Sequence, residues 1–133
     1  MISREDYITA SGKYPERLKS IELTQEVEDN IISLLLVVNS LLKELGIINI
    51  KVSSGFRPSA VNESIKGSAK RSAHMLGLAI DFETNQLALV LAKKPELLKK
   101  FGLWLEHPNY TKTWTHLDLV NRKDRPVRIF IPS

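Results

Sequence analysis

The sequence predicts an α+β fold: one domain in which helices pack on one side of a mostly antiparallel sheet. Three observations indicate this. The 133 residues are 43% hydrophobic and contain no repeat, which suits one compact domain with one core. One long segment carries apolar residues at helical spacing, and several short segments carry them at strand spacing. We expect an N-terminal arm at 1–23, a long helix at 24–45, and a sheet with further helices at 47–133.

The long helix has a clear start and end. Thr24 is a good N-cap, Glu26 and Glu28 lie in the first turn, and Gly46 ends the pattern. Because a domain this small needs an apolar stripe for its own core, we expect the stripe to be structural and not a partner-binding face. It consists of Val27, Ile31, Leu34, Leu35, Val38, Leu41, Leu42 and Leu45.

The next segment, "INIKVSS" (48–54), alternates apolar and polar residues and predicts a half-buried strand. It stops at "GFRP", where Gly55 and Pro58 favour a turn. The polar connection that follows, 59–72, has room for one helical turn.

The remaining elements are shorter. "QLALVLAKKPELLKKFG" (86–102) predicts one helix broken, or two joined, at Pro95, with Gly102 as the stop. Three strands follow: "LWLE", "WTHLDLV" and "VRIFIP".

Composition excludes several classes of site. There is no cysteine, so disulfides, thiolate metal sites and cysteine nucleophiles are ruled out. The first residues are polar and no stretch has the length of a membrane span, so we expect a protein that is cytoplasmic as synthesised, without a signal peptide or membrane insertion. We also expect a monomer. The net charge of +4 and the basic cluster Arg122–Arg128 would suit a polyanion, but a solvated basic face is the simpler interpretation.

His74 and Asp81 stand at the two ends of "HMLGLAID". Seven extended residues would separate them by roughly 23 to 25 Å, too far for two side chains to reach one ion. The chain must therefore turn, and Gly77 is where a tight turn is tolerated. We expect His74 on an entering loop and Asp81 on the strand after the turn.

The strand "WTHLDL" places Trp114, His116 and Asp118 on one face. Such a face is unusual in a core and natural on a cleft floor. Two imidazoles and one carboxylate, from His74, His116 and Asp81, would make a three-ligand zinc site with a fourth position for water. A lone histidine is more often a satisfied polar group, and a strand-end aspartate a turn residue, but the combined spacing favours one zinc per chain.

Two further polar residues, His107 and Ser72, are expected to lie outside the metal site. His107 in "EHPNY" is expected on an exposed loop, with roles as an oxyanion donor or as a ligand in place of Asp81 left open. Ser72 is expected to cap the approach to His74.

"SGFRP", "SAHMLGLAID" and "WTHLD" together resemble the motif blocks of the zinc D-alanyl-D-alanine carboxypeptidases and L-alanyl-D-glutamate endopeptidases, in particular the phage-encoded cell-wall peptidases. The vancomycin-resistance dipeptidases and the hedgehog signalling domain are more distantly similar. The resemblance runs from about Val52 to the C-terminus. It implies a hedgehog-like peptidase fold, zinc ligation by His74, Asp81 and His116, and an Arg57 that steadies the substrate carbonyl or carboxylate.

The sequence departs from this family at one position. Many members have an acidic general base three residues before the last zinc histidine, where this chain has Thr113. We expect Glu106, on the strand that should form a hairpin with "WTHLDL", to serve as the base. Asp118 is the alternative, although it could instead orient a histidine.

The leading hypothesis is a zinc metallopeptidase that hydrolyses an amide bond in peptidoglycan peptides, as a phage or prophage lysis enzyme of carboxypeptidase or endopeptidase type. The alternative is a zinc-bearing, non-hydrolytic cell-wall binding or virion scaffold protein, which Thr113 permits. A small nucleic-acid-binding domain is disfavoured, because it leaves the histidines and Asp81 unexplained.

Overall fold

A five-stranded sheet lies at the centre of the computed structural model, which describes residues 1–10, 15–59, 62 and 72–132. The strands follow the order β1-β2-β4-β3-β5. Three pairings are antiparallel, as expected, but β5 pairs with β3 in parallel. The sheet is therefore mixed. After β4, the chain passes β3 and adds β5 at the far edge, where β5 runs in the same direction as β3. The strands are β1 (Val52–Ser54), β2 (Ala79–Phe82), β3 (Trp104–Glu106), β4 (Thr115–Asp118) and β5 (Ile129–Phe130).

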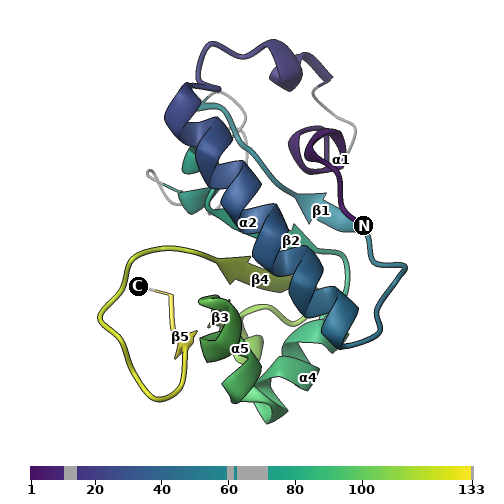
Figure 1. Cartoon of the computed structure of the whole chain (residues 1–133), viewed down its shortest axis with the longest axis vertical. Coiled ribbons are helices and arrows are strands. Elements are labelled where there is room, and N and C mark those ends of the chain that lie inside the picture. Colours follow the sequence, from purple (N-terminus) through teal and green to yellow (C-terminus); the bar gives the residue numbers. More distant parts are fainter. Residues whose placement is uncertain (11–14, 60–61, 63–71, 133) are drawn as a thin grey trace.

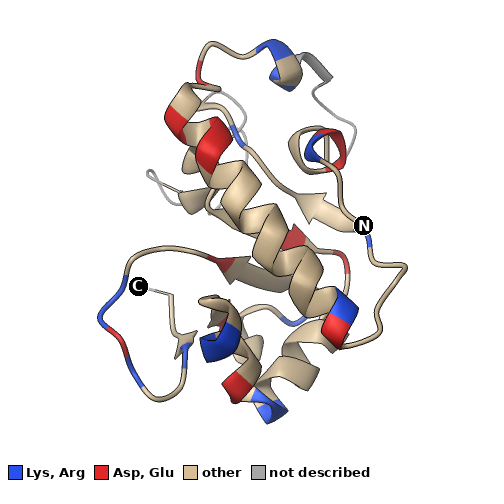
Figure 2. Cartoon of the chain, in the orientation of Figure 1, with Lys and Arg blue, Asp and Glu red and all other residues tan. Residues whose placement is uncertain are grey.

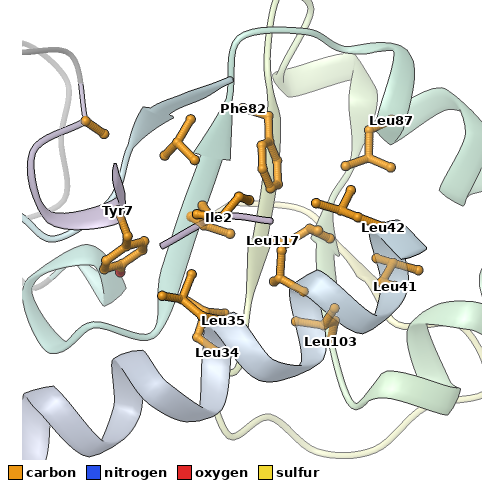
Figure 3. Packing of buried hydrophobic residues seen from close by; sticks show 14 of the residues in the cluster. Ile2, Tyr7, Leu34, Leu35, Leu41, Leu42, Phe82, Leu87, Leu103 and Leu117 are labelled. Atoms are coloured by element: carbon orange, nitrogen blue, oxygen red, sulfur yellow. The ribbon is translucent and has the colours of Figure 1, made fainter. Parts of the chain in front are cut away.

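The predicted long helix is α2 (Gln25–Glu44), which crosses the sheet in Figure 1. Its N-cap is Thr24, whose side chain accepts a hydrogen bond from the Val27 amide at 3.3 Å. Its apolar stripe is buried, and Figure 3 shows leucines of this helix facing Phe82 and Leu117 of the sheet. The stripe is thus part of the core of this chain.

The helical pattern at 86–102 forms two helices, α4 (Gln86–Lys93) and α5 (Pro95–Phe101). The break falls at Pro95, and Gly102 ends α5 with a positive φ of 69°, as its position predicted. None of the helices in the described ranges has the length and apolar composition that a bilayer crossing needs.

The N-terminal arm includes α1 (Arg4–Ile8) and the 3₁₀ helix η1 (Pro15–Lys19). Tyr7 and Ile8 are fully buried, and the Tyr7 hydroxyl donates a hydrogen bond to the Ala79 carbonyl at 2.7 Å. The arm is therefore anchored to β2.

The strand expected at 48–54 is shorter than its pattern suggested. Only residues 52–54 form the strand, although the Lys51 carbonyl accepts a hydrogen bond from the Glu83 amide at 3.0 Å. Ile48 is 84% exposed, and the register shifts between Val52 and Ser54. Since β1 is an edge strand, the preceding residues have no second partner to hold them in the sheet. The helical turn expected in 59–72 falls largely outside the described residues.

The sheet has one core face and one polar face. Ile80, Leu105 and Leu117 belong to the hydrophobic core under α2. Their neighbours along the strands, among them Asp81 and His116, point to the opposite face because side chains alternate along a strand. Asp81 and His116 therefore lie on the face of the sheet that α2 does not cover.

Candidate metal centre

The turn that joins His74 to Asp81 forms at Gly77, as the sequence predicted. Gly77 has a φ of +71°, and a Cβ there would lie 2.7 Å from the Ile31 side chain and 3.0 Å from the Val27 carbonyl. Glycine is needed both for the backbone angle and for close approach to α2. His74 does not lie on an open loop, however, but within the 3₁₀ helix η2 (Ala73–Leu76).

Ser72 caps this helix, as expected. Its hydroxyl accepts a hydrogen bond from the His74 amide at 3.2 Å. The cap satisfies an amide at the start of η2 that has no partner within the helix.

Asp81 lies between the two histidines. It is directly opposite His116 in the β2–β4 pairing, with 2.8 Å between Oδ1 and the His116 Nδ1. Its other oxygen, Oδ2, lies 3.3 Å from the His74 Nε2. One ligand atom from each of the three residues lies within 4.8 Å of the others, which meets the distance requirement for a shared metal ion.

In each histidine, the ring nitrogen that points away from Asp81 lies next to an oxygen that can accept its hydrogen bond. The Nδ1 of His74 lies 2.8 Å from the Gly55 carbonyl, which can only accept, so this nitrogen donates and leaves Nε2 free to bind a metal. The Nε2 of His116 lies 2.8 Å from Asp118 Oδ2, which leaves Nδ1 facing Asp81. Metal-bound histidines are oriented in the same way, by hydrogen bonds from the second ring nitrogen.

Contacts with carboxylates control the charge of this group. Burial alone would lower the pKa of His116, but hydrogen bonds to Asp118 and Asp81 raise it to about 10. Burial would also raise the pKa of Asp81, but His74 and His116 hold it well below its usual range. Without a metal, the arrangement favours a protonated His116 between two carboxylates.

Arg57 lies beside the same carboxylate. Its Nη2 is 3.3 Å from Asp81 Oδ2, and its Nε donates to the Ser54 hydroxyl at 2.8 Å. Its backbone amide donates to the His74 carbonyl at 3.1 Å, which joins the "SGFRP" loop to η2. The structure thus brings Arg57 to the metal group.

Asp118 is saturated with donors and only 1% exposed. Besides His116, it accepts hydrogen bonds from two Arg122 nitrogens, at 2.6 and 3.2 Å, and from the Val120 amide at 3.1 Å. This environment stabilises its charge and, although burial would raise its pKa, His116 and Arg122 lower it. Such a carboxylate is suited to orienting His116.

Glu106 differs from Asp118 in that it is half-buried and accepts no hydrogen bond from the described residues. It comes from β3, which forms the expected hairpin with β4. Burial raises its pKa; His116 opposes this change, and Asp81 and Asp118 add to it. In the metal-free protein, the Glu106 carboxylate therefore has a higher proton affinity than an exposed glutamate.

His107 is not part of the metal group. Its Nδ1 accepts a hydrogen bond from the Asn109 amide at 3.1 Å and so caps the 3₁₀ helix η3 (Pro108–Tyr110). His107 thus lies in a loop segment beside a proline, as expected, but it is half-buried and not exposed.

Three contacts of the site were not predicted. They are the Gly55 carbonyl behind His74, Arg122 on Asp118, and the Phe130 ring, which lies 5.8 Å from the His116 ring. A backbone carbonyl leaves no signal in a sequence. The four-residue spacing of Asp118 and Arg122 was visible, but it lies outside a helix, where that spacing carries no expectation of contact.

Comparison with known proteins adds one finding. A family model described as Peptidase M15 matches residues 13–118, a range that contains His74, Asp81 and His116. No curated protein and no solved structure matches the chain.

Proposed function

The chain belongs to the peptidase M15 family, and on that premise we propose that it is a zinc-dependent peptidase that hydrolyses an amide bond in peptidoglycan peptides. The observation that carries the proposal is the group of His74, Asp81 and His116, with ligand atoms within 4.8 Å of one another. The finer proposal is a carboxypeptidase or endopeptidase that a phage or prophage uses to lyse the cell wall.

The donor set fits zinc. Two imidazole nitrogens and one carboxylate oxygen are ligands that catalytic zinc uses, and both histidines have the outer hydrogen bond that such ligands need. When bound, zinc supplies a Lewis acid that polarises a carbonyl and makes water more acidic. His74, Asp81 and His116 would hold it.

Glu106, Arg57 and Asp118 have separate roles in the reaction. Glu106 accepts a proton from the attacking water, whose oxygen forms a bond to the carbonyl carbon. As the carbon–nitrogen bond breaks, Glu106 returns that proton to the leaving amine. In the metal-free protein, burial raises the pKa of Glu106, which favours proton uptake at this position.

Arg57 and Asp118 have supporting roles. Nη1 of Arg57 has no acceptor among the described residues, so this part of the guanidinium can hold the developing oxyanion or a terminal carboxylate. Asp118 holds the ring of His116 in position and is not the base, since its oxygens already accept hydrogen bonds from His116, Arg122 and Val120.

A non-hydrolytic scaffold remains the second candidate because Thr113 replaces an acidic residue of the family pattern. Incubation of the zinc-loaded chain with purified peptidoglycan fragments, followed by mass analysis, separates the two. A peptidase yields fragments with one water added per bond cleaved. Intact fragments in the presence of one zinc per chain would favour the scaffold.

A further inference from the structure

A pocket of about 700 Å³ lies beside the metal centre, between β5 and the loop that joins β4 to β5. Figure 2 shows that this loop is rich in basic residues. Among the described residues, no acidic side chain lines the pocket. The lining residues that matter here are His107, Arg122, Arg125, Val127, Phe130 and Ile131.

The two arginines differ in how their charge is balanced. Arg122 is paired with Asp118, whereas Arg125 has no carboxylate partner among the described residues. Arg125 is nevertheless held in place, because its Nη2 donates to the Ile129 carbonyl at 3.1 Å and its guanidinium lies 5.6 Å from the centre of the Trp104 ring. The pocket therefore contains a positioned cation that has no counter-charge within the described part of the chain.

The pocket and the metal centre share a wall. Phe130 lines the pocket, and its ring lies 5.8 Å from that of His116. His107, on the other side, follows Glu106 in the chain, and its amide donates to the Phe130 carbonyl at 2.8 Å. A peptide bound at the metal centre would need only a short extension to reach Arg125.

The lining also limits what the pocket accepts. Val127 and Ile131 are exposed apolar side chains that face the same space as the cation. Such a lining suits a group with methylene or methyl carbons next to an anion, and the planar guanidinium matches a carboxylate well. The stem peptides of peptidoglycan carry free carboxylates of this kind.

We propose that this pocket is a substrate subsite in which Arg125 binds a carboxylate of the peptide, next to the bond that is cleaved. The proposal rests on the proposed function for the identity of the peptide. It assigns the basic C-terminal loop to substrate selection, a role that neither the metal group nor Glu106 provides.

The test compares a stem peptide with free carboxylates and the same peptide with those carboxylates amidated. Binding is measured by calorimetry in the zinc-loaded Glu106→Gln protein, and hydrolysis is measured in the wild type. We expect the free-carboxylate peptide to bind about tenfold more tightly, as one charge-assisted hydrogen-bonded pair allows. Because Arg57 can also hold a terminal carboxylate, Arg125→Gln should remove most, and not all, of this preference, and Arg125→Lys should restore part of it.

Arg128→Gln is the matched control. Arg128 also lies over Trp104, at 4.7 Å, but it is paired with Asp124 and does not line the pocket. This variant should keep the tenfold preference. Equal loss of the preference in both variants would overturn the proposal, because it would indicate a general effect of charge.

The outcomes separate the two proposals. Hydrolysis with equal affinity for both peptides would overturn the subsite alone, whereas a carboxylate preference that depends on Arg125, without hydrolysis, would overturn the proposed function alone. Inorganic phosphate is added as a competitor in a further series. If it occupies the pocket through Arg125 while both peptides bind equally, the pocket serves a phosphate-bearing ligand and the carboxylate proposal is wrong.

Discussion

Asp81 and His116 face each other across the β2–β4 pairing, with 2.8 Å between Oδ1 and Nδ1. The antiparallel register sets this contact, since it places the two residues directly opposite each other on the polar face. His74 then reaches the second oxygen of Asp81 from η2. The backbone of the sheet thus holds two of the three candidate ligands in place before any metal binds.

Removal of either histidine should abolish stoichiometric zinc. His74→Ala and His116→Ala each remove one of three candidate ligands, so we expect metal analysis to show less than about a tenth of the wild-type zinc content. His107→Ala is the control, because His107 caps η3 and should leave zinc unchanged. Full occupancy in both ligand variants would place the metal elsewhere.

Zinc affinity should rise with pH. The pKa of His116 in the metal-free protein is raised to about 10, so below that pH a proton must leave before Nδ1 can bind a metal. For one displaced proton, we expect the affinity to rise about tenfold per pH unit between pH 6 and 8. A competing chelator measures the affinity, and calorimetry in buffers of different ionisation enthalpy counts the protons released. An affinity that stays flat over this range would contradict the protonated His116.

The same contact predicts how the stability of the metal-free protein depends on pH. Because the pKa of His116 is raised on folding, its contribution is fully present below the unfolded value near 6.5 and is lost as pH rises through about 10. The free energy of unfolding should therefore fall across this window, by at most about 1.4 kcal/mol per pH unit for one proton. Denaturant titrations measure it, and His116→Gln should remove the slope. A slope that His116→Gln leaves unchanged would assign it to other groups.

Much of this architecture was predictable because it rests on local chemistry. The stripe of α2, the break at Pro95 and the turn at Gly77 each follow from side-chain spacing or backbone freedom at a single site. The parallel pairing of β5 was not predictable, since it depends on the route of the chain around the sheet. The short β1 reflects its place at an edge, which alternation along one strand cannot reveal.

The candidate ligands were predictable from residue type and spacing, whereas the residues that orient them were only partly so. Asp118 shares a strand face with His116, and that relationship is visible in the sequence. The Gly55 carbonyl and Phe130 come from segments distant along the chain. Only the folded sheet brings them to the histidines.

Asp118→Asn should act mainly on the metal and on stability. It weakens the carboxylate contact to His116 and leaves Arg122 without its charged partner. We expect roughly a 10- to 100-fold loss of zinc affinity, the usual effect of changing a group that orients a ligand. Thermal unfolding should also begin at a lower temperature, because the charge of Arg122 is left without its buried partner. With saturating zinc, most of the turnover number should return.

Glu106→Gln should act on turnover and leave the metal in place. The substitution keeps shape and polarity but removes the proton acceptor, so we expect the turnover number to fall roughly 100- to 10,000-fold, the contribution of a positioned acid or base. Because Glu106 must be ionised to accept a proton, the wild-type rate should decline as pH falls and Glu106 becomes protonated, and the residual rate of the variant should lack that part of the decline. Zinc content and the unfolding temperature should match the wild type, since Glu106 is not among the three candidate ligands and accepts no hydrogen bond from the described residues.

Kinetics of this variant and of Asp118→Asn on one peptidoglycan peptide, both at saturating zinc, decide between the two carboxylates. If Asp118→Asn loses more turnover while Glu106→Gln stays near wild type, the general base is Asp118, on the strand of His116, and Glu106 takes no part in proton transfer.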